Sequence, residues 1–173
     1  RTAFARGSGA RYTAAGEPIA LPGRVADLAA QADGTLLALF ERDGQLVSIG
    51  RDGKALNRVA AAGATAVAVD RSGRTWLAAA GKLSIGDSGL SIPLPAKSEV
   101  VSIAPTGPRS AWIADAGDRR VVRLNGDGTI AVTAPLPPRA DPVSVAAAGD
   151  GGVWVLDARG PTLLLFGPGG EQR

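Results

Sequence analysis

The sequence contains no cysteine, no histidine and no methionine, and only 4% of its 173 residues are aromatic. Without Cys or His, the chain lacks the usual ligands of zinc fingers, iron–sulfur clusters and haem, and it can form no disulfide. Every catalytic arrangement that pairs a Ser or Cys nucleophile with a His base is excluded as well. We therefore expect no metal site and no cofactor in this chain.

Long uninterrupted segments are also missing, because 24 Gly and 12 Pro divide the chain. The longest segment free of both residues is 24–33, which is ten residues long. A membrane-spanning helix needs about 20 apolar residues, and a coiled coil needs several heptads. We therefore expect neither. A hydrophobic content of 45% with a net charge of only +3 indicates a folded domain rather than a disordered chain.

The basic charge is dispersed rather than concentrated. Of the 19 basic residues, only Lys54, Lys82 and Lys97 are lysines, and 16 acidic residues oppose them. A nucleic-acid-binding domain usually gathers its positive charge on one face, whereas here Arg and Asp alternate, as in 42–43 and 51–52. We expect no nucleic-acid partner. Absence of Cys is compatible with the periplasm or the extracellular space, which is the compartment we predict.

The chain contains an internal repeat that organises its sequence. Trp112 aligns with Trp154 at an offset of 42, without a gap through residue 166. An offset of 75 places Leu37 on Trp112, and a third copy runs through Trp76 with a central turn that is three residues shorter. These four equivalent positions lie 39, 36 and 42 residues apart.

Each copy follows the same plan of short strands. An apolar run leads through a Gly-containing turn to the strand that holds Trp or Leu, then to a third strand and a more polar fourth strand such as 129–135. Runs of this kind are typical of strands joined in hairpins. The Ala-rich segment 24–33 could be helical by propensity. Its counterparts 65–69 and 101–103 contain β-branched residues, so we predict a strand there too.

Four strands in about 40 residues are typical of a β-propeller blade. A blade cannot bury its apolar faces alone and must stack on neighbours around an axis. We therefore predict an all-β fold, a β-propeller of about four four-stranded blades, with the first strands lining the axis. The strands that carry Trp or Leu would pack between blades. The predicted core positions are Leu37, Trp76, Trp112 and Trp154.

The repeat divides this single propeller domain into five segments. We predict that residues 1–22 supply one or more strands of a preceding or closing blade. Blades then follow at 23–62, 63–99 and 100–140, and residues 141–173 form an incomplete blade.

The ends of the chain leave two closures open. Residues 10–20 resemble a fourth strand that could complete the final blade and close the ring. Residues 3–9 resemble the end of a third strand, which such a closure does not need. The alternatives are a four-bladed ring and a portion of a larger propeller, and we favour the second.

Residues 114–128, ADAGDRRVVRLNGDG, resemble the NHL repeat and the related blades of streptogramin-lyase propellers. That family typically reads W-V-A-D, a short turn, and an R-V or R-I strand that ends in D-G. The resemblance runs from residue 23 to the end and is clearest in 100–166. Asp118 departs from the family pattern, and the unit with Trp76 has lost the turn. The resemblance implies a propeller fold and leaves the function open.

The same resemblance weighs against catalysis. The lyases of the group use His with a divalent metal, and this chain has no His. Lactonase-like relatives use Glu and Asn as metal ligands, and the only Asn residues here are Asn57 and Asn125. We therefore expect no catalytic residues.

Several short motifs are better explained by the repeat. The string 86–89, GDSG, copies a serine-protease motif but has no His base, and it aligns with the Asp-Gly turns. The strings 125–128 and 150–152 suggest calcium loops, but Leu136 and Pro161 stand at the twelfth position, where a Glu is required. We predict type I′-like hairpin turns there.

Two carboxylates and the tryptophans each allow two interpretations. Asp115 and Asp157 stand where the Trp strand meets its turn. They could cap that turn or act as an acid–base pair, and we favour capping because the other two units have no carboxylate at this position. The tryptophans could stack on a ligand, but their alternation with small residues favours core packing.

Arginines form the candidate partner-binding set. In a propeller, the turns between second and third strands share one face with the connections between blades. Such a face can hold carboxylates or phosphates through bidentate pairs. Acidic residues in the same segments leave the net field close to neutral, so a solvated face of mixed charge is the alternative. The set consists of Arg24, Arg42, Arg119, Arg120, Arg139 and Arg159.

These observations lead to one preferred function and two alternatives. We expect a non-catalytic propeller that acts as a protein-interaction, sensor or scaffold module, with a protein or other propeller segments as its partner. The first alternative is a lyase- or lactonase-like enzyme whose catalytic groups lie outside this chain or are lost. The second is a purely structural domain that spaces or caps parts of an assembly.

Overall fold

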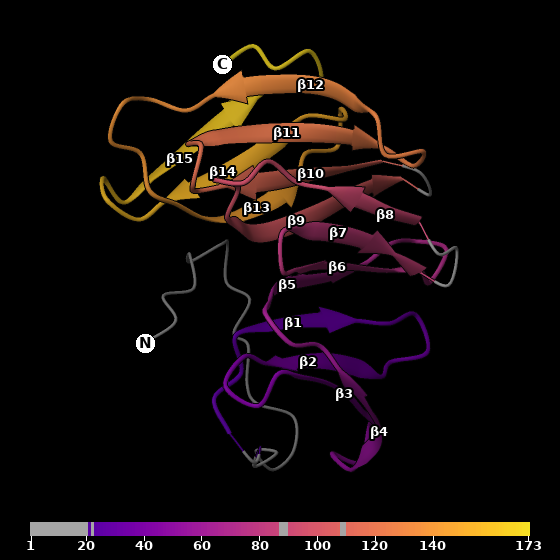
Figure 1. The fold of residues 1–173 in the computed structure, drawn as a ribbon. Coiled ribbons are helices and arrows are strands. Elements are labelled where there is room, and N and C mark those ends of the chain that lie inside the picture. The colour runs from indigo at the N-terminus through magenta and orange to yellow at the C-terminus, as the bar shows by residue number, and fades with distance from the viewer. Residues whose placement is uncertain (1–20, 22, 87–89, 108–109) are drawn as a thin grey trace, which may run out of the picture.

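The computed structural model describes residues 21, 23–86, 90–107 and 110–173. The described residues form fifteen β-strands in four antiparallel sheets (Figure 1). The predicted strand at 10–20 and residues 87–89 of the GDSG string lie outside the described residues. No helix in the described part of the chain is long and apolar enough to cross a membrane.

The strands follow one another in order within each sheet. Sheet 1 contains β1 (Asp27–Ala30), β2 (Leu36–Phe40), β3 (Gln45–Ile49) and β4 (Ala55–Ala60). Sheet 2 contains β5 (Ala64–Val69), β6 (Thr75–Ala79), β7 (Lys82–Ile85) and β8 (Leu90–Pro93). Sheet 3 contains β9 (Val100–Gly107), β10 (Ser110–Asp115), β11 (Arg120–Asn125) and β12 (Ile130–Pro135). Sheet 4 contains β13 (Pro142–Ala147), β14 (Val153–Asp157) and β15 (Thr162–Phe166).

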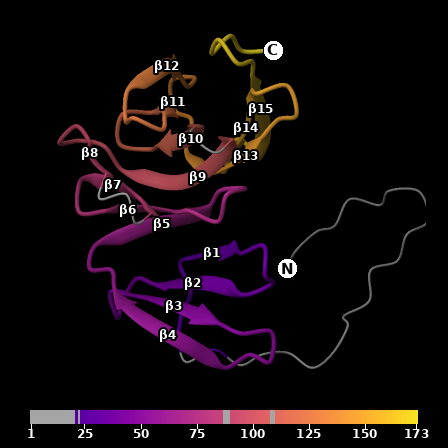
Figure 2. The same cartoon turned by 90° about the vertical axis from the view of Figure 1, so that its right-hand side faces the viewer.

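The sheets are the blades of a propeller, and their first strands lie toward a common axis. β1 packs beside β5, β5 beside β9, and β9 beside β13. These four strands line a hollow of about 280 Å³. The described residues form an open arc rather than a closed ring (Figure 2). The all-β propeller fold predicted from the sequence is confirmed. Sheet 4 has three strands and a single bridge between Phe166 and Gln172.

The core lies between sheets. Trp76 of sheet 2 packs in one cluster with Ile113 and Val122 of sheet 3, and Trp112 of sheet 3 packs with Val155 of sheet 4. Burying a large apolar side chain stabilises a fold by about 1.5–3 kcal/mol. An alanine on the first strand stands opposite each Trp or Leu position and leaves space for the larger side chain. These pairs are Ala29–Leu37, Ala68–Trp76, Ala104–Trp112 and Ala146–Trp154.

One predicted core residue is exposed. Leu37, Trp76 and Trp112 are buried, but Trp154 keeps 41% of its surface accessible. The physical reason is position in the arc, because no further sheet among the described residues packs over the Trp face of sheet 4. The repeat pattern does not predict the exposure of Trp154, since it assigns the same environment to the equivalent residue of every copy.

The hairpin turns differ in type from the prediction. In the loop after β1, the N–H of Gly34 donates to the carbonyl of Gln31, and Gly34 has a φ of 84°. The Asp33 carboxylate accepts a hydrogen bond from the N–H of Thr35 at 2.9 Å. This is a three-residue loop with one left-handed Gly, not a two-residue type I′ turn. The same geometry recurs at Gly53, Gly128 and Gly151, where the preceding Asp accepts the equivalent bond.

Asp70 anchors the corresponding turn of sheet 2 and is itself buried. Its carboxylate accepts hydrogen bonds from the Ser72 hydroxyl at 2.6 Å and from the Trp76 indole N–H at 3.2 Å. The Arg74 guanidinium pairs with it at 2.9 Å. Burial raises the pKa of Asp70, but the hydrogen bonds from Ser72, Arg74 and Trp76 outweigh burial and lower it to about 2.

We predict that Asp70→Asn destabilises the protein by about 2 kcal/mol at neutral pH. Because the pKa of Asp70 is lower in the folded state than its ordinary 3.8, its contribution is complete above about pH 4 and is lost as the pH falls through about 2. The difference between wild type and variant in denaturant unfolding should therefore vanish in that window. Asp52→Asn, in an exposed turn, is the control, with a change within about 0.5 kcal/mol. A pH-independent difference for Asp70→Asn would contradict this account.

Candidate functional site

The candidate site lies at one end of the sheets, which we call the 2–3 loop face. There the loop between second and third strands of each sheet meets the connections between sheets, because successive strands are antiparallel. The first strands begin at this same end, next to the axis. Loops held by a rigid scaffold are where binding residues concentrate.

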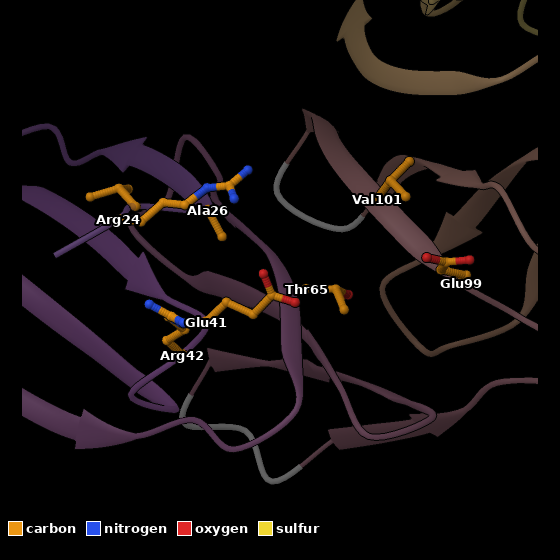
Figure 3. A pocket seen from close by; sticks show the side chains of 8 residues that line it. Arg24, Ala26, Glu41, Arg42, Thr65, Glu99 and Val101 are labelled. Atoms are coloured by element: carbon orange, nitrogen blue, oxygen red, sulfur yellow. The ribbon is translucent and has the colours of Figure 1, made fainter.

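Pocket A is a cavity of about 620 Å³ on this face. Sheet 1 contributes the segment before β1 and the loop after β2, sheet 2 contributes Thr65, and sheet 3 contributes the start of β9. Arg24 and Glu41 extend toward Thr65, and Glu99 and Val101 lie on the other side (Figure 3). The lining residues are Arg24, Val25, Ala26, Glu41, Arg42, Thr65, Glu99 and Val101.

Pocket A presents charges of both signs. Among the ion pairs formed between described residues, none involves Arg24, Glu41, Arg42 or Glu99. All four residues are exposed. Guanidinium groups without a protein partner can take a carboxylate in a bidentate pair, and free carboxylates can take an ammonium or guanidinium group. The pocket therefore suits a ligand that carries charges of both signs.

Pocket B is a second cavity on the same face, of about 570 Å³, between sheets 3 and 4. Its lining combines the proline-rich connection 137–140 with Asp157, Arg159 and Gly160. Arg139 has a φ of 98°, a conformation that non-glycine residues rarely adopt.

The structure divides the six predicted arginines into three groups. Arg24 and Arg42 line pocket A, and Arg139 and Arg159 line pocket B. Arg120 pairs with the carboxylates of Asp115 and Asp118, both at 3.0 Å, so its guanidinium group already has partners within the fold. Arg119 is exposed and lines neither pocket.

Asp115 clamps its loop to the connection from the preceding sheet. One oxygen accepts the backbone N–H of Glu99 at 2.9 Å, and the other accepts the Ser98 hydroxyl at 2.8 Å and the Arg120 guanidinium. Because Asp115 is fully buried and its oxygens hold these donors, the side chain has a structural role, which is the capping role favoured above.

Asp157 makes the matching clamp in sheet 4. Its carboxylate accepts the N–H of Asp141 at 2.9 Å and that of Arg159 at 3.0 Å. The N–H of Asp141, and then that of Arg159, lower the pKa of Asp157. The clamps hold the rims of both pockets, since Glu99 borders pocket A and Arg159 borders pocket B.

Glu41 and Glu99 are two of the acidic residues that lie in the same segments as the arginines, and the sequence alone did not place them in one site with Arg24. The two glutamates are 58 residues apart in sequence, and the curvature of the arc brings them to one cavity. No group of three or more acidic side chains among the described residues is arranged to hold a metal ion.

Solved structures share this architecture. The structure of streptogramin B lyase superposes with a TM-score of 0.75 at 19% identity, over 91% of this chain and 57% of that one. The chain has the propeller fold of the streptogramin lyases. Virginiamycin B lyase from Staphylococcus aureus gives a TM-score of 0.71 at 18% identity, over 86% of this chain and 54% of that one. A protein of unknown function from Bacteroides caccae superposes with a TM-score of 0.62 at 17% identity, over 90% of this chain and 61% of that one.

These similarities concern the fold alone, and the chain spans little more than half the length of those proteins. No protein-family model matches the sequence, and no curated protein is significantly similar to it. The resemblance of residues 114–128 to blades of this kind is confirmed for the fold.

Gly117 tests the clamped loop. A Cβ at this position would fall on the carbonyl oxygen of Lys97 and within 3.0 Å of the Glu99 nitrogen. We predict that Gly117→Ala destabilises the protein by about 1–3 kcal/mol, since backbone must move. Gly149→Ala, where a Cβ meets nothing within 4 Å, should change stability by no more than about 0.5 kcal/mol. Equal denaturation midpoints for the two variants would refute the close approach.

Proposed function

We propose that this chain is a non-catalytic β-propeller module that binds a protein partner at pocket A, in the periplasm or outside the cell. The observation that carries the proposal is the set of four charged side chains, two arginines and two glutamates, that surround one cavity without ion-pair partners among the described residues. A partner that supplies the opposite charges would satisfy all four.

The rigidity of the surroundings supports a binding role. Arg24 and Arg42 stand on segments joined to sheet 1, and Glu99 is held by its backbone N–H to the buried Asp115. Because the backbone at Glu99 is tied to a buried carboxylate, little conformational entropy of that loop is lost on binding. The lining is mostly exposed and open to a peptide segment.

The chemistry of the site also supports a role without catalysis. The chain has no His and no Cys, and the buried carboxylates of Asp70 and Asp115 already accept hydrogen bonds within their turns. The carboxylates that line pocket A, Glu41 and Glu99, are both exposed. Stoichiometric binding of a divalent metal in a calorimetric titration would favour a lyase-like enzyme instead.

Charge reversal in pocket A tests the proposal. On an array of acidic, basic and mixed-charge peptides, we expect the wild-type chain to bind mixed-charge peptides best, with affinities that fall as salt is raised. The double variant Arg24→Glu, Arg42→Glu should bind those peptides at least about tenfold more weakly, because each lost bidentate pair is a charge-assisted interaction.

The matched control is Arg71→Glu, in the loop between β5 and β6 at the opposite end of the sheets, which should bind as the wild type does. If the double variant bound the array as the wild type does, the proposal would be wrong. Thermal unfolding of all variants would establish that each is folded.

A further inference from the structure

Pocket B lies where two consecutive sheets meet at the 2–3 loop face. One wall is the connection 137–140 between β12 and β13, and the other is the loop after β14, which contains Arg159 and Gly160. Both segments lie at the same end of the sheets (Figure 1). The cavity of about 570 Å³ is in the size range of pockets that bind small molecules. Sheets 3 and 4 form this lining without a contribution from another sheet.

The corresponding segments of sheets 2 and 3 are in direct contact. An offset of 42 aligns Arg159 with Gly117 and Arg139 with Lys97. Gly117 approaches the connection so closely that a Cβ there would fall on the carbonyl oxygen of Lys97. Because Arg159 carries a Cβ at the equivalent position, the loop of sheet 4 cannot pack on its connection in the same way. Space for a ligand therefore remains between sheets 3 and 4.

The backbone of the connection also differs at Arg139. The N–H of Ala140 donates to the carbonyl of Pro137 at 2.9 Å, which makes 137–140 a four-residue turn. Arg139, at the third position of this turn, has a φ of 98°, whereas the equivalent Lys97 has no positive φ. A positive φ at the third position favours Gly or Asn. Arg139 thus holds a strained backbone conformation, and strain of this kind concentrates at functional sites.

The two arginines of pocket B have no ion-pair partner within the described part of the chain. None of the ion pairs formed there involves Arg139 or Arg159, and both residues are exposed. Asp157 also lines the pocket, but its carboxylate already accepts the backbone N–H groups of Asp141 and Arg159. The two guanidinium groups and this carboxylate give the lining a net charge of +1, which one further carboxylate would neutralise.

The lining suits a carboxylate that is joined to an apolar group. Guanidinium groups hold a carboxylate through charge-assisted hydrogen bonds, which can form in parallel pairs. Pro137, Pro138 and Ala140 supply the apolar part of the lining, against which a hydrocarbon group can be removed from water. A phosphate monoester carries close to two negative charges at neutral pH, which is more than the lining neutralises.

We propose that pocket B binds a small organic acid with one carboxylate, which Arg139 and Arg159 hold while its apolar part lies against the prolines. Pocket B is a different site from pocket A, whose lining has two basic and two acidic side chains and no net charge. The proposal does not rest on the proposed function.

The test is an NMR titration of the isotope-labelled chain with benzoate, which combines one carboxylate with an apolar ring. We expect saturable shifts of the backbone amide signals of Arg139, Ala140, Arg159 and Gly160, and an affinity that falls as salt is raised. Benzamide, a neutral molecule of the same shape, should bind at least about tenfold more weakly. Phenyl phosphate, with its larger charge, should bind no more tightly than benzoate.

Substitutions locate the site. Arg159→Gln should weaken benzoate binding at least about tenfold, because it removes a charge-assisted pair. Arg139→Gly should weaken binding by a similar factor without lowering the thermal midpoint, because Gly adopts a positive φ without strain. Arg119→Gln is the matched control, since Arg119 is exposed on the same face and lines neither pocket. This control and Arg42→Gln, in pocket A, should bind benzoate as the wild type does.

Several results would overturn the proposal. Absence of saturable shifts at pocket B, equal affinity for benzoate and benzamide, or tighter binding of phenyl phosphate would each contradict a site for one carboxylate. An Arg159→Gln variant that binds as the wild type does would exclude the guanidinium as a ligand. Equal losses in Arg159→Gln and Arg119→Gln would show an effect of overall charge rather than a site.

Discussion

The packing of one sheet's Trp face on the next sheet is the interaction on which the rest of this structure depends. A large side chain at 76 or 112 stands beside an alanine of its own first strand, and the next sheet covers it. The indole therefore fills the space beside the small alanine side chain of its own sheet. Because an isolated blade exposes both faces, each sheet is stable only as part of the stack.

This stacking also determines where binding chemistry can occur. Every sheet turns its first strand to the axis and its 2–3 loop to the same end, so residues distant in sequence collect on one face. Arg24 and Glu99 meet at pocket A for this reason. The buried carboxylates of Asp115 and Asp157 strengthen the arrangement, because each holds a loop of its own sheet to the connection from the sheet before.

Much of the fold could be predicted because its determinants are local. Gly34, Gly53 and Gly128 adopt positive φ in turns that their neighbours in sequence define, and the offsets between copies follow from those turns. The details of turn type were less accessible, since Asp33 and Asp127 stabilise three-residue loops that resemble two-residue turns in sequence. The capping role of Asp115 could be anticipated, but its partner Ser98 in the preceding connection could not.

The sequence by itself determined the number of repeats, the strand order in each sheet and the residues available for chemistry, because these depend on short-range alternation and turn residues. Only the tertiary structure decided which charged side chains line the same cavity. Arg42 and Glu99 both line pocket A, whereas Arg120 forms ion pairs with Asp115 and Asp118. It also decided that Trp154 is exposed although Trp76 and Trp112 are buried. Whether a Trp side chain is buried depends on the sheet that packs over it, and the sequence repeat does not indicate which copies have such a neighbouring sheet.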